Sequence, residues 1–202
     1  MRLMDKRRAV KGEYGYLKAQ MKREIFKTAL FFALAALFLI LGILIMKNRD
    51  PSLTLSQSRN NLLTIGAVLF ILPGAKFLVS TVMFAKALKY ATPADIRDRV
   101  IERNEAAAFD VYLTSYQQNF PMHAVVCGDN EIAGLSADPG IDENAAKEHI
   151  LQILKKDGIK NVTVKIFKDA DRFTERIGSM GVTEEALEKS QRLRTLILDV
   201  SL

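Results

Sequence analysis

Two long apolar runs separate a basic N-terminal arm from a C-terminal region in which apolar and polar residues alternate. The first run, Thr28 to Met46, contains no charged residue and is bracketed by Lys27 and Lys47. At 1.5 Å per residue, a helix over this run would be about 28 Å long, close to the thickness of the hydrocarbon layer of a bilayer. The run therefore predicts a transmembrane helix over residues 28–46.

The second apolar run extends over residues 62–85, where Pro73-Gly74 interrupts it and Lys76 adds a charge. Its length still suffices for a second transmembrane helix. Only the polar stretch 47–61 joins the two runs, which predicts a short extracytosolic loop and an antiparallel hairpin. We expect small residues to form the contact between the helices, namely Ala29, Ala33, Ala36 and Gly42 of the first run and Gly66, Ala67 and Gly74 of the second.

Beyond the second run, residues 92–202 show the periodicities of a small α+β domain with a mixed or antiparallel sheet. Turn-forming residues separate short apolar runs that are typical of strands. The expected elements are a helix from Thr92, as N-cap, to about residue 107, strands at 111–116, 123–127 and 131–137, a helix at 143–156 capped by Asp142, a strand at 161–167, a helix at 171–177 and another from Thr183 to Arg194.

The last eight residues, Thr195 to Leu202, fit two structures. Their alternation of apolar and polar positions is that of a strand, which we slightly favour. Leu193, Leu196, Ile197 and Val200 would equally share one stripe of a continued helix.

The basic residues are concentrated before the first run, and this predicts the orientation. Nine Lys or Arg precede Thr28, three lie in the connecting stretch, and Lys86 and Lys89 follow the second run. By the positive-inside rule, both termini are expected in the cytosol of a multi-pass cell-membrane protein. The cations expected at the membrane interface are Lys22, Arg23, Lys27, Lys47, Lys86 and Lys89.

The arm, residues 1–27, could lie on anionic lipid as an amphipathic segment or form a solvated flank, and its irregular apolar spacing favours the flank. From Lys86 onward, sixteen basic and nineteen acidic residues argue against a nucleic-acid partner. Cys127 is the single cysteine, so an intrachain disulfide is excluded and a reducing compartment suits the domain.

Lys76 is the one charged residue inside an expected span, and it allows two interpretations. Its ammonium could contact an acidic helix of another membrane protein. Alternatively, its aliphatic stem could let the ammonium reach the cytosolic interface, since the residue lies two to three turns from that end. We favour the second interpretation.

Candidates for chemistry are few. His123 and Cys127 are four residues apart on one expected strand and so should share a face, but about 13 Å separates them along the backbone, too far for a nucleophile pair. His149 has no accompanying metal-ligand motif. The acidic residues that could hold a hard cation, or that simply form a solvated rim, are Asp129, Glu131, Asp138, Asp142 and Glu143.

The sequence thus predicts the location and orientation of the chain in a membrane more clearly than any biochemical activity. The leading expectation is a non-enzymatic integral membrane protein that presents a cytosolic α+β domain to bind or position another protein, or a second copy, without a cofactor. One alternative is a membrane-tethered enzyme, such as a metal-dependent hydrolase that uses the acidic residues from Asp129 to Glu143. Another is an accessory subunit of a transporter or envelope complex, with Lys76 against a partner helix.

Overall fold

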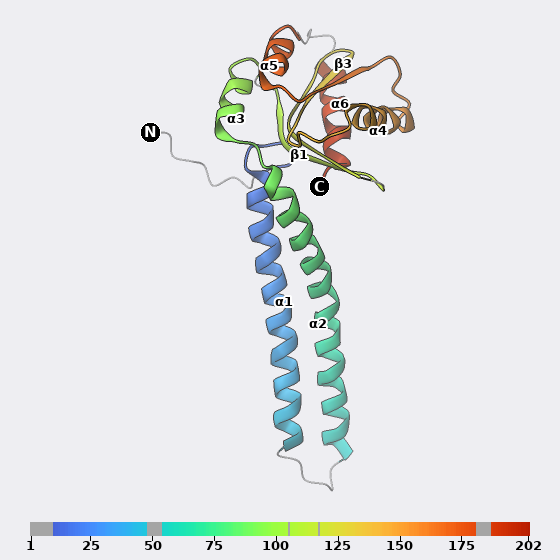
Figure 1. Cartoon of the computed structure of the whole chain (residues 1–202). Coiled ribbons are helices and arrows are strands. Elements are labelled where there is room, and N and C mark those ends of the chain that lie inside the picture. The colour runs from blue at the N-terminus through green and yellow to red at the C-terminus, as the bar shows by residue number, and fades with distance from the viewer. Residues whose placement is uncertain (1–9, 48–53, 105, 117, 181–186) are drawn as a thin grey trace. The chain divides into compact units, whose positions relative to one another are not determined.

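The structure, a computed structural model, describes residues 10–47, 54–104, 106–116, 118–180 and 187–202, with the side chains of residues 46, 47 and 54–61 excepted. Two long helices are followed by a domain of four strands and shorter helices (Figure 1). The chain divides into two compact units. Among the described residues, the domain comprises 10–19 and 86–202 and the helical hairpin comprises 20–85. Each unit is considered by itself.

The long helices are α1, Tyr16–Lys47, and α2, Thr54–Ala87. Both are long and apolar enough to cross a membrane, and only 11% of the most apolar stretch of each is buried, unlike the core helix of a soluble protein. Each helix is longer than expected. The basic segment up to Lys27 is already helical from Tyr16, and α2 begins at Thr54 within the stretch predicted as a loop.

Aromatic and small residues pack the two helices of the hairpin against each other. The ring of Phe31 lies 5.3 Å from that of Phe77, and the ring of Phe38 lies 5.2 Å from that of Phe70. Thr28 and Thr81 share a hydrogen bond of 3.2 Å between their hydroxyl groups. The contacts confirm that the helices are antiparallel neighbours, because residue numbers rise along α1 as they fall along α2.

The prediction of which small residues form this contact is only partly correct. Gly42, Ala67 and Gly74 are buried, and the ring of Phe38 lies over Gly66. Ala29, Ala33 and Ala36 are exposed instead, and Ala35 is buried. The periodicity of α1 does not reveal the packed side, because nearly every position from Thr28 onward is apolar.

The domain contains a four-stranded sheet in the order β1-β2-β3-β4, and it is mixed, one of the two sheet types that the sequence predicts. The first three strands are antiparallel, and β4 is parallel to β3 after a crossover through α4. The strands are β1, Ala108–Thr114, β2, Asn119–Cys127, β3, Glu131–Ser136, and β4, Thr163–Phe167. The chain order of helix, three strands, helix and strand is the one that the sequence predicts.

Helices cover both faces of the sheet and form two apolar cores. On one face lie α4, Glu143–Lys156, and α6, Leu187–Asp199, whereas α3, Ala94–Ile101, and α5, Ala170–Gly178, cover the other (Figure 1). The first core centres on buried residues such as Ile132, Ile150 and Leu193, and the second on Val100, Phe173 and Ile177.

A bulge in β2 changes which residues share a face. The register between β2 and β3 shifts between Met122 and Ala124, so that His123 is the extra residue. An extra residue reverses the alternation of side chains beyond it. Met122 and Cys127 therefore both lie in the first core, and the prediction that His123 and Cys127 share a face is wrong.

Local signals predicted some helix ends correctly and others not. Asp142 caps α4, accepting the N–H groups of Asn144 and Ala145 at 3.0 Å as expected. Thr92 does not cap α3, because its hydroxyl donates to the carbonyl oxygen of His123 and the helix begins after Pro93 without a side-chain cap.

The strand favoured for residues 195–202 is wrong. Helix α6 continues to Asp199, and only Ser201 forms an isolated bridge, to Leu113. Leu193 and Ile197, which the helical alternative places on one stripe, are both buried. The expected start of this helix at Thr183 lies outside the described residues.

The segment just before α1 belongs to the domain, which the sequence did not indicate. Phe109 donates its backbone N–H to the carbonyl oxygen of Gly12 at 2.9 Å, and the ring of Tyr14 meets that of Phe109 edge to face. Lys11 donates to the carbonyl oxygens of Leu198 and Ser201 at the end of α6. Part of the predicted basic arm is thus a structural element of the domain.

Candidate functional site

Two pockets open at opposite ends of the parallel strand pair β3 and β4. One, of about 400 Å³, lies where these strands begin, and we call it the Glu131 pocket. The other, of about 240 Å³, lies where they end, and we call it the His123 pocket. In open α/β sheets, ligands usually bind beyond the carboxyl ends of parallel strands, so the His123 pocket has the more common position.

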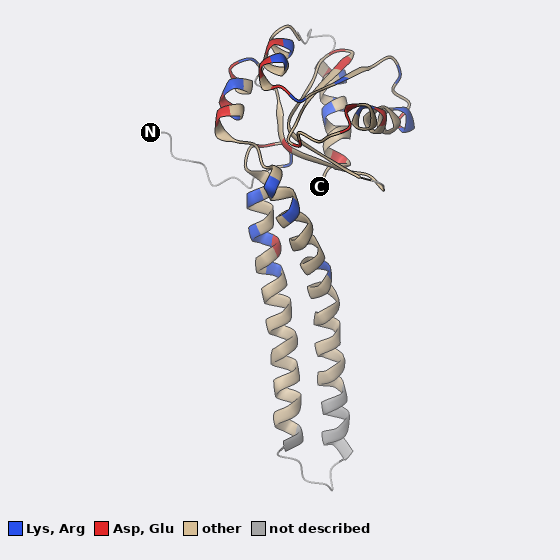
Figure 2. Ribbon diagram, viewed as in Figure 1, with Lys and Arg blue, Asp and Glu red and all other residues tan. Residues whose placement is uncertain are grey.

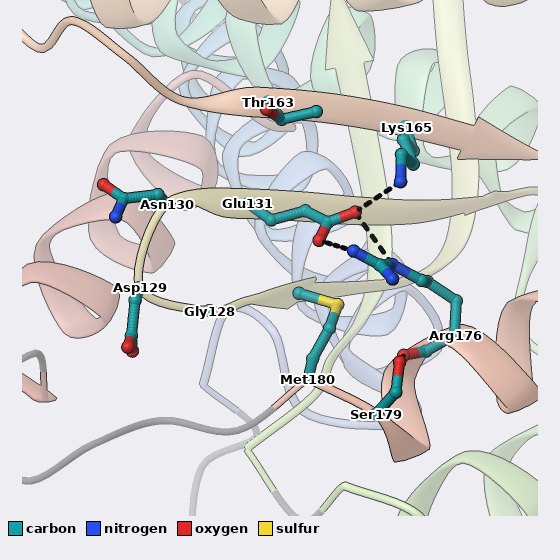
Figure 3. Close-up of a pocket in the computed structure, with 9 residues that line it drawn as sticks. All are labelled: Gly128, Asp129, Asn130, Glu131, Thr163, Lys165, Arg176, Ser179 and Met180. Atoms are coloured by element: carbon teal, nitrogen blue, oxygen red, sulfur yellow. Dashed lines mark hydrogen bonds and ion pairs between the residues drawn. The ribbon is translucent and has the colours of Figure 1, made fainter.

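In the Glu131 pocket, two cations converge on one carboxylate (Figure 3). Arg176 of α5 donates to both carboxylate oxygens of Glu131, at 2.9 Å through Nε, and Lys165 of β4 lies 3.3 Å from Oε1. Burial alone would raise the pKa of Glu131, but hydrogen bonds from Arg176 and Lys165, together with their charges, lower it. The carboxylate stays ionised at neutral pH and connects β3, β4 and α5, which suits a structural clamp better than a proton donor.

The His123 pocket is lined by the imidazole ring of His123, by the loop after β3 and by residues of two helices. His123 faces it together with Ser136, Asp138 and Lys168, beside apolar groups of α3 and α5. Burial lowers the pKa of His123 and outweighs the opposing charge of Asp110, so the imidazole is neutral at neutral pH. A neutral imidazole in a pocket could accept a proton.

No nucleophile is aligned with that imidazole in the described part of the chain. The hydroxyl of Ser136 donates to the carbonyl oxygen of Asp138 at 2.9 Å and accepts the N–H of Asp138 at 3.0 Å. Cys127 lies in the core on the opposite face, where burial raises the pKa of its thiol to about 12. The Cys-His pair considered from the sequence is therefore not formed.

The acidic residues between 129 and 143 take separate roles. Glu131 binds Arg176, Asp142 caps α4, and Glu143 lies 3.6 Å from Lys168. Asp138 accepts the N–H of Gly140 in its loop. Among the residues that the structure describes, no three His, Cys, Asp or Glu side chains group closely enough to hold a metal ion.

His149 lines neither the Glu131 pocket nor the His123 pocket. Its ring stacks obliquely on that of Phe120 at 5.4 Å, between α4 and the β1-β2 hairpin. Burial, then the charge of Lys156, lowers its pKa.

The hairpin carries the second candidate surface. Among residues 16–45 and 62–87, whose side chains the structure describes, basic and acidic residues occur only toward the end formed by the start of α1 and the end of α2 (Figure 2). Of the predicted interface residues, Lys22, Lys86 and Lys89 are exposed, and Arg23 contacts Gln20 at 3.4 Å. The side chain of Lys47 lies outside the described residues.

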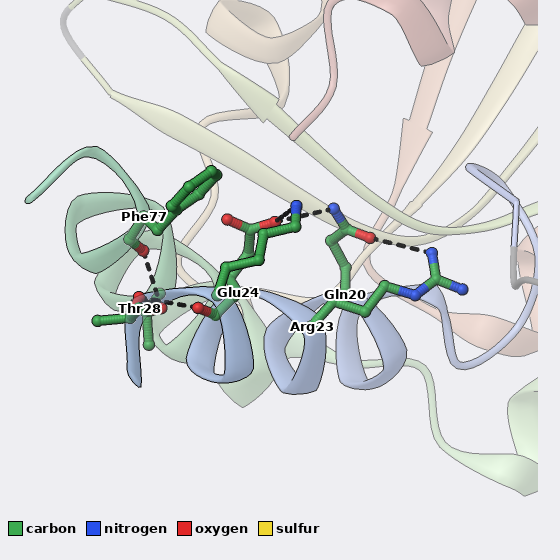
Figure 4. Close-up of polar contacts among 7 residues, drawn as sticks. Gln20, Arg23, Glu24, Thr28 and Phe77 are labelled. Atoms are coloured by element: carbon green, nitrogen blue, oxygen red, sulfur yellow. Dashed lines mark hydrogen bonds and ion pairs between the residues drawn. The ribbon is translucent and has the colours of Figure 1, made fainter. Parts of the chain in front are cut away.

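One acidic residue is buried at this end of the hairpin (Figure 4). Glu24 has an exposed fraction of only 4% and receives Lys27 Nζ at 2.7 Å and Gln20 Nε2 at 3.4 Å. The same Lys27 ammonium lies 5.0 Å from the centre of the Phe77 ring on α2. Sequence reasoning did not single out Glu24, although its spacing of three residues from Lys27 allows the pair.

No protein-family model matches this sequence, and neither a curated protein nor a solved structure matches it.

Proposed function

We propose that this chain is an integral membrane protein whose helices α1 and α2 cross the cell membrane and whose mixed-sheet domain binds or positions another protein at the cytosolic face. The exposure of apolar side chains along both helices carries the proposal. Large hydrophobic residues stay more than one-third exposed, for example Ile43 at 63%, Leu69 at 62% and Leu72 at 64%. Water would penalise such a surface, whereas lipid would cover it.

The charges beside the apolar stretches support the orientation. Lys22, Arg23 and Lys27 precede the uncharged part of α1, and Lys76 and then Lys86 follow that of α2. Because the helices are antiparallel, these cations belong to one end of the hairpin. An excess of cations is the usual mark of the cytosolic side.

Two features of the domain support a role in presentation to a partner. It has an apolar core on each face of the sheet, so it is a folded body in its own right. Tyr116, between β1 and β2, is fully exposed at 105%. Exposed aromatic side chains are frequent anchors of protein interfaces.

Membrane insertion and orientation can be tested together. We expect the full-length protein to remain in the membrane pellet after alkaline carbonate washing. In a Cys127→Ala background, a cysteine at Ser52 should react with an impermeant maleimide from outside intact cells, and one at Lys160 only after the membrane is opened. Release by carbonate would refute insertion, and the reverse labelling pattern would refute the orientation.

Partner binding requires a separate experiment. A photo-crosslinking amino acid at position 116 should form a discrete adduct with another protein in intact cells, whereas the same group at exposed Lys160 should not. Equal adducts from both positions would argue against a defined interface at Tyr116. An adduct of twice the chain's mass would identify the partner as a second copy.

A further inference from the structure

The helix contacts fix the level of Lys76 along the hairpin. Its neighbour Phe77 lies 5.3 Å from Phe31, ring to ring, and carries the Lys27 ammonium 5.0 Å from its ring centre. Four residues of helix correspond to about 6 Å along the axis. Lys76 is thus at the level of the first helical turn after Lys27, near the edge of the apolar stretch of α1, although the mostly apolar residues 77–85 follow it in α2.

The lengths of the uncharged stretches in the two helices are consistent with Lys76 lying at the edge of the hydrocarbon layer. In α2 the stretch between Arg59 and Lys76 would be about 24 Å long, and in α1 the stretch between Lys27 and Lys47 about 28 Å. Both values approach the thickness of bilayer hydrocarbon, about 30 Å. Lys27 and Lys76 end these stretches on the same side of the hairpin.

The surroundings of the two lysines differ. Lys27 is engaged by Glu24, which lies 2.7 Å from its ammonium. Lys76 is exposed, and no described side chain forms an ion pair with it. Exposed Lys22 adds a further charge on α1, five residues before Lys27. The cations here outnumber the single carboxylate of Glu24.

From this geometry we propose that Lys76 binds the phosphate of an anionic lipid headgroup in the cytosolic leaflet, in a basic belt with Lys22, Arg23 and Lys27. The inference rests on the membrane insertion proposed above. A primary ammonium offers three donors to phosphate oxygens, and its aliphatic stem can remain against acyl chains. At this edge, phosphate lies within reach, so an acidic partner helix is not needed to satisfy the charge.

Lipid retention tests the proposal directly. Full-length protein would be reconstituted in nanodiscs of phosphatidylcholine mixed with phosphatidylglycerol, and bound lipids counted by native mass spectrometry. Each basic residue near an anionic surface contributes about 1 kcal/mol, so Lys76→Leu should lower the preference for phosphatidylglycerol about fivefold. Lys76→Arg should preserve it, and Lys160→Leu, at an exposed lysine of the domain, should not change it.

A depth measurement distinguishes this inference from the proposed function. In a Cys127→Ala background, a spin label at position 76 should be accessible to a polar relaxation agent to nearly the extent of one at Lys86, and far more than one at Leu69. A label at 76 as inaccessible as that at Leu69 would overturn the inference while leaving insertion intact. A preference unchanged by Lys76→Leu would overturn it equally. Labels accessible at all three positions would instead refute insertion.

Discussion

The carboxylate of Asp110 accepts the backbone N–H of Thr92 at 2.8 Å through Oδ1, while its Oδ2 accepts that of Gly15 at 2.9 Å. Thr92 lies five residues after the end of α2, and Gly15 is the last residue before α1. One side chain of β1 therefore holds the two segments that lead to and from the hairpin. Asp110 is 4% exposed and has a φ of 54°, a left-handed conformation that Asp tolerates better than most residues.

Asp110→Ala should destabilise the domain by about 2–5 kcal/mol, because it leaves two N–H groups without an acceptor and places Ala at a positive φ. Asp110→Asn keeps one amide oxygen and should cost about half as much. The midpoint of domain unfolding in detergent, followed by limited proteolysis, measures both. Asp98→Ala removes an exposed carboxylate and is the control, expected to change stability by less than about 0.5 kcal/mol. Equal effects of the Asp110 and Asp98 variants would contradict the proposed role of Asp110.

The N-terminal segment provides a second prediction. A fragment of residues 92–202 lacks Lys11, Gly12 and Gly15, which bind α6, β1 and Asp110. A second form retains residues 10–19 and 86–202 and replaces the hairpin by a flexible linker. We expect it to be more stable than the fragment by about 2–5 kcal/mol, from several hydrogen bonds of about 1 kcal/mol each and the Tyr14–Phe109 contact. Urea unfolding compares the two.

The linked form also contains its own control. Lys11→Ala and Tyr14→Ala together should remove much of the added stability, because they delete the contacts with the end of α6 and with Phe109. Equal urea midpoints for the fragment and the linked form would show that residues 10–15 do not stabilise the domain.

The elements predicted correctly from the sequence are those specified by nearby residues. Asp142 before α4 and the alternation of β4 are local signals, and both elements were located within two residues. Residues 195–202 carry both a period of two and a helical stripe, so the sequence could not decide between them. Tertiary contacts decide in favour of the helix, since Leu193 and Ile197 of α6 pack into the core.

The candidate sites depend on relations that no local pattern contains. Glu131 meets Arg176 because β3 lies beside α5, and Thr92 binds His123 instead of capping α3. The bulge at His123 reverses the faces of β2, and Pro121, two residues before it, is the only local residue that hints at an irregular strand. In the hairpin, nearly every position is apolar, so the sequence does not indicate which side of each helix is packed. The lengths of the uncharged stretches, in contrast, follow directly from the sequence.

Acidification should weaken the Glu131 clamp. The folded-state pKa of Glu131 is lowered, so its contribution to stability is present above the ordinary glutamate pKa of 4.5 and is lost as pH falls through the folded pKa. We expect Glu131→Gln to reduce stability at pH 7 and to flatten the fall in stability below pH 4.5. Glu143→Gln, whose ion pair with Lys168 is longer and exposed, is the control. A wild-type acid profile retained in Glu131→Gln would rule out this carboxylate as its source.

The hairpin contact can be tested by a disulfide. The hydroxyl oxygens of Thr28 and Thr81 lie 3.2 Å apart, so cysteines at these positions are near enough to bond after small rotations. In a Cys127→Ala background, Thr28→Cys with Thr81→Cys should be oxidised to a disulfide within one chain by an added oxidant. The bond is detected by the loss of the mass of two hydrogen atoms and by two fragments that stay joined after cleavage between α1 and α2. Thr28→Cys with exposed Val79→Cys is the matched control and should not form this bond. Bonding only between chains would show that α1 and α2 contact each other in a dimer and not within one hairpin.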